Sequence, residues 1–223
     1  MPELYIVATP IGNLSDMTFR AVETLKSVDF IVAEDTRHAG ILLKKYEIQT
    51  ALLSFHAQSS DRKAEEIIKR IKKGETAAYI SDAGTPCISD PGYKLTSLAA
   101  QANIPISPIP GPCALTTLIS ACGMPADQFV FHGFLPHKKG RQTLLTSMKE
   151  SKMPHIFYES VHRFGKLLEQ LKELVGAERT ICVGRELTKI HEEIFRGSVQ
   201  QAQDHFDKEN TRGEFVVMVM PKK

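Results

Sequence analysis

The sequence predicts an α/β protein built of two lobes. Short apolar runs alternate with segments whose apolar residues recur at helical spacing, which is typical of βαβ units and a mostly parallel sheet. A proline-rich stretch at residues 108–112 then interrupts the pattern, and its rigid backbone suits a junction between lobes. We therefore expect an N-terminal lobe over residues 1–110 with a mostly parallel sheet, and a C-terminal lobe over residues 111–223 with a mixed sheet.

In the N-terminal lobe, the first strand is expected at residues 4–8, an apolar run long enough for a strand buried on both faces. Asp16 is expected to cap the helix that follows it, because Asp is a favoured N-cap residue. Apolar runs or helical spacing then predict strands at residues 30–33, 76–80 and 104–109, and helices around residues 64–71 and 94–102.

The C-terminal lobe continues the alternation of strands and helices. Helical spacing predicts helices around residues 115–122, 141–150, 164–171 and 199–206. Apolar runs predict strands at residues 129–134, 155–158, 180–184, 193–196 and 215–220. The last run is apolar throughout and predicts a buried strand.

Composition excludes several classes of protein. With 42% hydrophobic and 24% charged residues, the 223-residue chain is neither disordered nor fibrous. No apolar run reaches the roughly 18 residues of a membrane-spanning helix, and no basic region precedes an apolar stretch at the N-terminus, so we expect a cytoplasmic protein without a targeting segment. The four cysteines form no C-x-x-C pair, which argues against a disulfide framework or a zinc site. The net charge of +2 means that a nucleic-acid partner needs a locally basic surface.

The segment from Ser81 to Gly92 is the strongest candidate for a ligand-binding loop. It contains two glycines, two prolines and two aspartates directly after a predicted strand. Ligands of open parallel sheets bind beyond the carboxyl ends of the strands, and glycine lets a ligand approach the backbone closely. The plain alternative is a strand-to-helix loop in which Asp90 caps the next helix; this leaves Asp82 unexplained.

The turn after the first strand does not match a dinucleotide-binding fingerprint. Gly12 is the only glycine where three are expected, and Pro10 removes an amide that a pyrophosphate could use. Glu34 and Asp35 end the second strand, where a ribose-binding acid would lie. An NAD-dependent oxidoreductase is therefore disfavoured.

A set of motifs follows the order of one known family along nearly the whole chain. They are Thr9-Pro10-Ile11-Gly12, Glu34-Asp35-Thr36-Arg37, Ser81 to Gly92, Pro110-Gly111-Pro112-Cys113-Ala114, Gly133-Phe134-Leu135-Pro136, Tyr158-Glu159-Ser160-Val161-His162-Arg163, Gly184-Arg185-Glu186-Leu187-Thr188-Lys189, His191-Glu192-Glu193 and Gly213-Glu214-Phe215. On these residues the chain resembles the tetrapyrrole methylase superfamily, and within it the branch that methylates the ribose 2′-hydroxyl of a cytidine in 16S ribosomal RNA. Two departures are Val161, where the family usually has proline, and a chain that ends soon after Met220, where many relatives continue into a helical extension.

The resemblance implies S-adenosylmethionine (SAM) as methyl donor, bound in a cleft between the two lobes, and a homodimer. It implies cofactor contacts at Ile11, Thr85, Ile88, Cys113, Ala114, Glu159 and Glu214. A positive sulfonium is stabilised by carboxylates, so Asp82 joins Glu159 and Glu214 as an expected lining of the cleft. The implied partner is 16S ribosomal RNA or the small ribosomal subunit, with no membrane.

Methyl transfer to a ribose hydroxyl needs a group that accepts the hydroxyl proton. Our hypothesis is that Glu34, Asp35 or Glu186 orients or deprotonates the hydroxyl, and that Arg37, Arg163 and Arg185 bind phosphates. The alternative is that Arg185 with Glu186, and Glu159 with Arg163, form structural ion pairs, because such pairs also cluster at sites.

The densest short basic run is His137-Lys138-Lys139-Gly140-Arg141. Such runs are usually the solvated face of a helix. In an RNA-binding enzyme, Lys138, Lys139 and Arg141 are expected to line a path for phosphates. The histidines lack the spacing of metal ligands, so no metal is expected.

Two other functions remain open from the sequence. A member of the same superfamily could methylate a tetrapyrrole ring or a protein side chain, although a porphyrinoid substrate would call for a more apolar cleft. A protein of a different class could bind SAM or RNA without catalysis.

Overall fold

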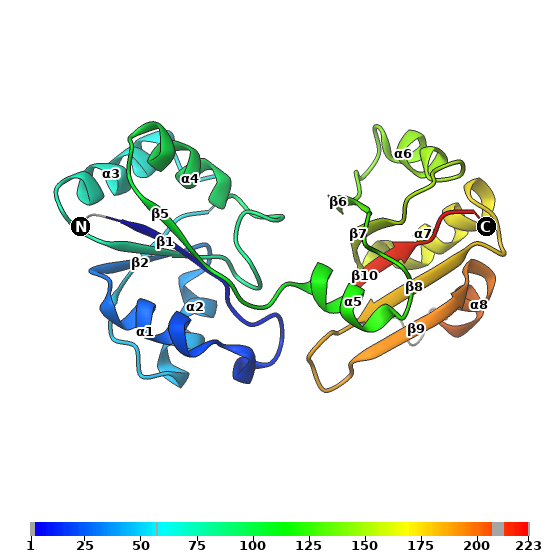
Figure 1. The fold of residues 1–223 in the computed structure, drawn as a ribbon, viewed down its shortest axis with the longest axis horizontal. Coiled ribbons are helices and arrows are strands. Elements are labelled where there is room, and N and C mark those ends of the chain that lie inside the picture. Colours follow the sequence, from blue (N-terminus) through cyan, green and yellow to red (C-terminus); the bar gives the residue numbers. More distant parts are fainter. Residues whose placement is uncertain (1–2, 57, 207–211, 223) are drawn as a thin grey trace. The chain divides into compact units, whose positions relative to one another are not determined.

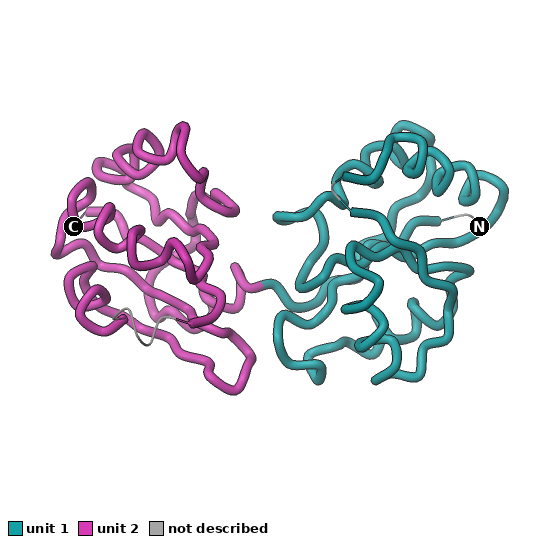
Figure 2. The backbone as a smooth tube through the Cα atoms, turned by 180° about the vertical axis from the view of Figure 1, so that it is seen from behind, with its two compact units in different colours: residues 1–113 teal, residues 114–223 magenta. Residues whose placement is uncertain are grey.

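The computed structural model describes residues 3–56, 58–206 and 212–222, and its chain divides into two compact units (Figure 2). Unit 1 covers residues 1–113 and unit 2 covers residues 114–223. The division falls three residues after the predicted boundary, because Thr85 Oγ1 donates a hydrogen bond of 3.0 Å to the carbonyl oxygen of Pro112 and so ties the proline-rich stretch to unit 1. No helix in the described part of the chain is both long and apolar enough to cross a membrane.

Unit 1 contains a five-stranded, fully parallel sheet in the order β3-β2-β4-β1-β5. Its strands are β1 (Leu4–Val7), β2 (Phe30–Ala33), β3 (Ala51–Ser54), β4 (Ala77–Ile80) and β5 (Ile106–Ile109). The helices are η1 (Leu14–Asp16), α1 (Phe19–Ser27), α2 (Thr36–Lys45), α3 (Asp61–Lys72) and α4 (Gly92–Gln101). The predicted parallel sheet is confirmed.

Helices cover both faces of this sheet (Figure 1). Alternate residues of a strand face opposite sides, so Ile31 and Ala33 of β2 pack with α1 and α2, whereas Phe30 and Val32 pack with α3 and α4. All four side chains are buried, which explains why the strand is apolar throughout.

Two local predictions for unit 1 were incomplete or wrong. The sequence analysis assigned no element between residues 34 and 63, where α2 and β3 lie; β3 is an edge strand with partly exposed side chains, so it lacks a distinct apolar run. Asp16 does not cap α1. The cap is Thr18, whose Oγ1 accepts a hydrogen bond of 3.1 Å from the amide of Ala21, because η1 separates Asp16 from the helix.

Unit 2 contains a mixed sheet in the order β6-β7-β10-β8-β9, in which only β6 and β7 run parallel. Its strands are β6 (Val130–Phe134), β7 (His155–Ser160), β8 (Thr180–Arg185), β9 (Glu193–Ser198) and β10 (Glu214–Val219). The helices are α5 (Ala114–Cys122), α6 (Arg141–Ser147), α7 (Val161–Leu174) and α8 (Val199–His205). The predicted mixed sheet is confirmed.

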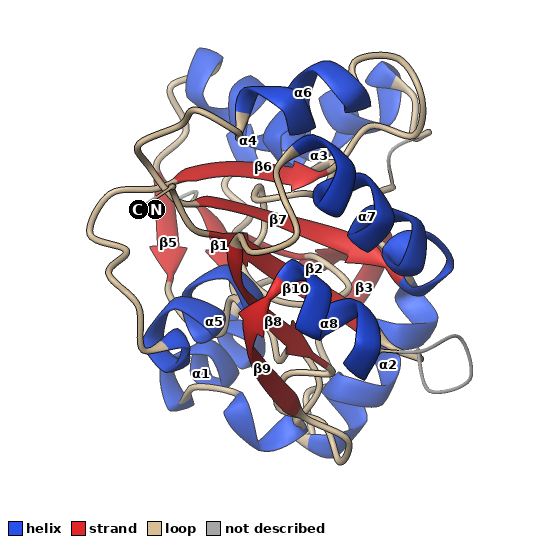
Figure 3. Cartoon of the chain, turned by 90° about the vertical axis from the view of Figure 1, so that its right-hand side faces the viewer, coloured by secondary structure: helices blue, strands red, loops and turns tan. Residues whose placement is uncertain are grey.

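One face of this sheet forms the main core of unit 2. Phe157 of β7 and Phe215 of β10 pack there with side chains from α6, α7 and α8, and the Phe164 ring of α7 stacks on Phe215 at 3.9 Å. Figure 3 shows α7 and α8 beside each other over these strands. The opposite face is contacted by α5 at β8, β9 and β10.

Candidate active site

The carboxyl ends of β1, β2 and β4 bring three loops of unit 1 together (Figure 1). The central position of β4 places Asp82 beside the end of β2, where its Oδ1 accepts a hydrogen bond of 2.9 Å from the amide of Asp35. On the other side, Thr9 and Gly84 exchange two backbone hydrogen bonds of 3.0 and 3.1 Å. The loop singled out in the sequence is therefore fixed to both neighbouring strand ends.

Asp90 shapes the second half of this loop. Its two carboxylate oxygens accept hydrogen bonds from the amides of Cys87 (2.7 Å) and Gly92 (2.8 Å), and Gly92 begins α4. The alternative role for Asp90, capping the next helix, is not confirmed, because the N-cap of α4 is Pro91 and α4 has no side-chain cap hydrogen bond. Asp90 lies one residue earlier and binds the amide of Gly92 from there. Burial raises the pKa of Asp90 despite these hydrogen bonds. Cys87 has a left-handed φ of 69°, a strained conformation for a non-glycine residue that is enriched at functional sites.

Glu34 differs electrostatically from the other acids at these strand ends. Its pKa is raised, chiefly by burial and then by the negative charges of Asp82 and Asp90. It borders an open depression of ≈730 Å³ that is also lined by Cys87, Ile88, Ser89, Asp90, Pro91, Tyr93 and Lys94. A carboxyl group with a raised pKa at the edge of a depression is a candidate for proton transfer.

The pKa of Asp35, one residue further on, is shifted in the opposite direction, downward. Arg37 donates hydrogen bonds to both carboxylate oxygens of Asp35, through Nη2 at 2.7 Å and through Nε at 3.2 Å, and its amide donates a third at 2.8 Å. These bonds hold the pKa of Asp35 well below its usual range. Asp35 is the N-cap of α2 and a weak proton acceptor.

Several predicted cofactor residues meet in unit 1. Gly84, with a φ of +79°, lies so close to Ile11 that a Cβ at this glycine would be 3.2 Å from Ile11 Cγ2. Thr85 is bonded to Pro112, which directly precedes Cys113. The structure therefore brings together three segments that are far apart in the sequence, at residues 11, 84–85 and 112–113.

Two further features of unit 1 concern the surface of this loop and the packing of the proline-rich stretch. Ile88 is 41% exposed and Asp82 is exposed, so an apolar side chain and a carboxylate are both available at the loop surface. Gly111 lies against Ala8, where an added Cβ would be 3.0 Å from the Ala8 Cβ. A larger side chain at residue 111 would push the proline-rich stretch away from β1.

In unit 2, Glu186 and Glu214 share one lysine. Lys189 Nζ lies 2.9 Å from Glu186 Oε1 and 2.9 Å from Glu214 Oε2. Burial acts to raise the pKa of Glu186, but hydrogen bonds from Lys189 and from the Glu214 amide outweigh it and lower that pKa. A Cβ at Gly213 would lie 2.4 Å from Glu186 Cγ, so glycine is needed beside this network. Glu186 is therefore a weak candidate for a base, while Glu214 is 81% exposed.

Glu159 lies in a buried cluster with two arginines. Its side chain has no exposed surface, and its oxygens lie 2.8 Å from Arg141 Nη1 and 2.6 Å from Arg163 Nη2. The alternative reading of Glu159 and Arg163 as a structural ion pair is confirmed. Arg163 also donates to the Leu135 carbonyl oxygen at 3.0 Å and to Ser160 Oγ at 3.2 Å, so its guanidinium is fully engaged.

The prediction that Arg141 belongs to an exposed basic run is wrong. Its side chain is only 6% exposed, because Nε donates to Gln170 Oε1 at 2.8 Å while Nη1 binds Glu159. Lys138 and Lys139 are exposed, as expected. The run divides at Gly140, whose φ of +85° turns the chain into α6.

The two remaining arginines that were predicted to bind phosphates, Arg37 and Arg185, differ in exposure. Arg37 is 90% exposed and could meet a phosphate. Arg185 is 19% exposed, and its guanidinium binds the Arg212 carbonyl oxygen at 2.6 Å and Glu193 at 3.2 Å. The alternative prediction that Arg185 pairs with Glu186 is wrong. Arg185 pairs instead with Glu193, the residue opposite it on the neighbouring strand β9.

Two residues of these networks were missed by the sequence analysis. Tyr79, in β4, is fully buried and its hydroxyl lies 3.4 Å from Asp90 Oδ1. Its signal was a phenol within an otherwise aliphatic strand. Lys189 lies within one of the motifs, but no local pattern assigns it a role, because its bridging of Glu186 and Glu214 depends on the pairing of β8 with β10.

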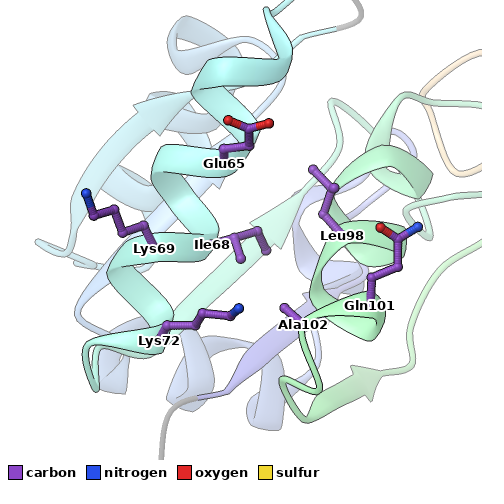
Figure 4. Close-up of a pocket in the computed structure, with 7 residues that line it drawn as sticks. All are labelled: Glu65, Ile68, Lys69, Lys72, Leu98, Gln101 and Ala102. Atoms are coloured by element: carbon purple, nitrogen blue, oxygen red, sulfur yellow. The ribbon is translucent and has the colours of Figure 1, made fainter.

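None of the predicted site residues lies in the groove between α3 and α4 (Figure 4). This groove measures ≈430 Å³ and is lined by Glu65, Ile68, Lys69, Lys72, Leu98, Gln101 and Ala102. Ile68 points from α3 toward α4. Within the described residues, no three His, Cys, Asp or Glu side chains are placed to share a metal ion.

Comparison with solved structures defines the class of fold. A diphthine synthase superposes with a TM-score of 0.75 at 10% identity, over 99% of this chain and 90% of that one. The cobalamin biosynthetic enzyme cobalt precorrin-4 methyltransferase gives a TM-score of 0.72 at 16% identity, over 98% and 94% of the two chains. At these identities the likeness establishes the fold alone, a two-unit α/β fold.

Sequence comparison identifies the family. The family of Tetrapyrrole (Corrin/Porphyrin) Methylases matches residues 3–203, and the chain belongs to it. Ribosomal RNA small subunit methyltransferase I of Thermotoga maritima is 44% identical over 222 residues, covering 100% of both chains. A protein of the same name from Synechocystis is 46% identical, and the match covers 97% of this chain and 78% of that one. The one from Escherichia coli O157:H7 is 44% identical, with 97% and 77% covered.

Proposed function

We propose that this protein transfers a methyl group from SAM to the ribose 2′-hydroxyl of a cytidine in 16S ribosomal RNA. The observation that carries this proposal is the 44% identity, over the full length of both chains, to a protein named ribosomal RNA small subunit methyltransferase I. The acids and glycines gathered at the strand ends of unit 1 support it, because they offer a ligand loop and a proton acceptor side by side.

SAM, when bound, supplies a methyl group on a positively charged sulfonium. We assign its contacts in unit 1 to Ile11, Asp82, Thr85, Ile88 and Cys113, and in unit 2 to Ala114 and Glu214. Exposed carboxylates at Asp82 and Glu214 suit the positive charge. Glu159 is left out of these contacts, because its side chain has no exposed surface and its ion pairs with Arg141 and Arg163 support unit 2 from within.

Glu34 is the proposed proton acceptor. SAM would supply the methyl group, and the Glu34 carboxylate would take up the proton that the ribose hydroxyl releases on methylation. Its raised pKa makes it a better base than Asp35 or Glu186, whose hydrogen bonds to cations lower their pKa values. Residues that hold and orient the ribose hydroxyl toward the methyl donor would supply a further part of the acceleration.

The exposed cations Arg37, Lys138 and Lys139 are proposed to bind phosphates of the substrate. Arg163 and Arg185 are committed to hydrogen bonds within unit 2, so we assign them the positioning of loops instead. A homodimer is also proposed, and its mass in solution by light scattering tests it.

Three measurements in sequence test the proposed function. Titration calorimetry with SAM should give saturable binding, and labelled SAM should then transfer one methyl group per small subunit to subunits from cells that lack this gene. Mapping of 2′-O-methylation should locate the group on a cytidine. Binding of SAM without transfer to RNA would overturn the proposal, and transfer to a porphyrinoid would favour the tetrapyrrole alternative.

A further inference from the structure

Three aromatic rings form a cluster on β6 and β7 of unit 2. The ring of Tyr158 meets Phe131 with centroids 5.2 Å apart and Phe134 with centroids 5.4 Å apart, both edge to face. Phe134 is 56% exposed, and Phe131 and Tyr158 are partly exposed. β6 is one of the two edge strands of the sheet, so the cluster lies at a margin of the sheet.

A β-bulge creates this cluster. Phe131 pairs with Ile156 and Phe134 with Tyr158, so two residues of β6, His132 and Gly133, lie opposite the single residue between them on β7. In a regular strand, residues three apart face opposite sides of the sheet. The extra residue, with Gly133 at a φ of +60°, turns Phe134 to the same side as Phe131. Bulges that redirect a side chain are common beside functional sites.

The chain around the cluster is positively charged. No acidic residue occurs between Asp127 and Glu150, and the exposed Lys138 and Lys139 follow Phe134 closely. Exposed rings near exposed lysines are typical of surfaces that bind single-stranded nucleic acid, where bases stack on aromatic faces and cations bind the backbone. A symmetric contact with a second copy would bring the lysines of both copies together, which disfavours that occupant.

We propose that Phe134, supported by Phe131 and Tyr158, stacks on a base of single-stranded RNA, while Lys138 and Lys139 bind the adjoining phosphates. This inference rests on the proposed function and adds a base-binding subsite to it. The subsite is sequence-tolerant, because every base has a face that can stack.

The test replaces the ring without removing its apolar character. A single-stranded oligoribonucleotide from the small-subunit RNA, carrying 2-aminopurine, is titrated with wild-type protein, Phe134→Leu and Phe134→Tyr. Phe134→Leu should bind about tenfold more weakly and lose most of the fluorescence quenching that stacking causes. Phe134→Tyr keeps the ring and should bind like the wild type.

Phe19→Leu is the matched control, because Phe19 is 92% exposed but lies on α1 of unit 1. It should leave RNA affinity and quenching unchanged. SAM calorimetry and light scattering on the same variants check the cofactor site and the oligomeric state.

Each result has a defined meaning. Unchanged RNA affinity and quenching in Phe134→Leu would overturn the subsite. The subsite would also be overturned if Phe134→Leu lost the dimer or its affinity for SAM but still bound RNA like the wild type. If the wild-type protein methylates small subunits while Phe134→Leu binds RNA normally, the subsite fails and the proposed function stands. If the wild-type protein binds the probe but methylates no RNA, the proposed function fails while the subsite stands.

Discussion

Two neighbouring acids, Glu34 and Asp35, show how strongly position controls the chemistry of a carboxyl group. Both follow β2, yet burial raises the pKa of Glu34 and Arg37 lowers that of Asp35. Their side chains project in different directions from the strand end, one beside Asp82 and Asp90 and the other toward α2. Glu34 is therefore the better proton acceptor of the two.

Replacing Glu34 should therefore change the pH dependence of methyl transfer. In the wild type, single-turnover transfer should rise with pH through a pKa above the ordinary glutamate value, because Glu34 must lose its proton before it can accept another. Glu34→Gln should lower the rate about 100-fold and abolish this acidic limb, while SAM affinity is kept. Asp35→Asn serves as the comparison; an acidic limb that survives in Glu34→Gln would assign the base elsewhere.

His155 links stability to pH in unit 2. Its Nδ1 and the Nε2 of His132 lie 2.7 Å apart, and burial followed by the charge of His132 lowers the pKa of His155 to about 4. The unfolded chain takes up this proton near pH ~6.5, whereas the folded chain resists it until about pH 4. The stability from neutral His155 is thus complete above the unfolded pKa and is lost as the pH falls between these two values.

We expect His155→Gln to flatten this part of the pH profile. Free energies of unfolding in urea, measured between pH ~7 and pH ~4.5, should fall less steeply in the variant than in the wild type. The exposed His191→Gln provides the control and should follow the wild-type slope. Equal slopes in His155→Gln and the wild type would contradict the assignment.

At the scale of elements, buried ion pairs fasten a loop to the sheet of unit 2. Glu159 on β7 binds Arg141 at the start of α6 and Arg163 on α7. Arg163 also holds the Leu135 carbonyl oxygen, at the beginning of the loop that carries Lys138. A single buried carboxylate therefore connects β7, α6, α7 and this loop.

Glu159→Gln should destabilise the fold strongly. It leaves two arginines, one of them buried, without their negative partner, and breaking a buried pair typically costs about 3–5 kcal/mol. Glu66→Gln removes one partner of the exposed pair between Arg62 and Glu66 and should cost about 0.5 kcal/mol or less. Urea unfolding of both variants measures the difference; equal costs would show that burial does not control the strength of this cluster.

At the scale of the whole molecule, charge is uneven although the net charge is only +2. The acids gather at the strand ends of unit 1, where they raise the pKa of Glu34. All the charged residues between Asp127 and Glu150 are basic. A polyanion is therefore expected to bind through a local surface, and its affinity should depend on salt.

The double variant Lys138→Gln/Lys139→Gln should reduce this salt dependence. If each lysine neutralises one phosphate of a single strand, the slope of log affinity against log salt should fall by about 1.4. Lys69→Gln/Lys72→Gln, in the groove between α3 and α4, is the matched control and should leave the slope unchanged. Equal slopes in the two double variants would remove Lys138 and Lys139 from the RNA surface.

The sequence by itself determined the class of fold and where the principal loop lies. Apolar runs such as residues 30–33 are local signals, because a strand buried on both faces needs an apolar side chain at every position. The order of motifs likewise pointed to the family that the comparisons establish.

Only the tertiary structure decided which side chains are available. Arg141 and Lys139 belong to one basic run, yet one is buried and the other exposed. Phe131 and Phe134 share a face only because Gly133 forms a bulge. Burial and register arise from contacts between residues far apart in the chain, so no local pattern records them.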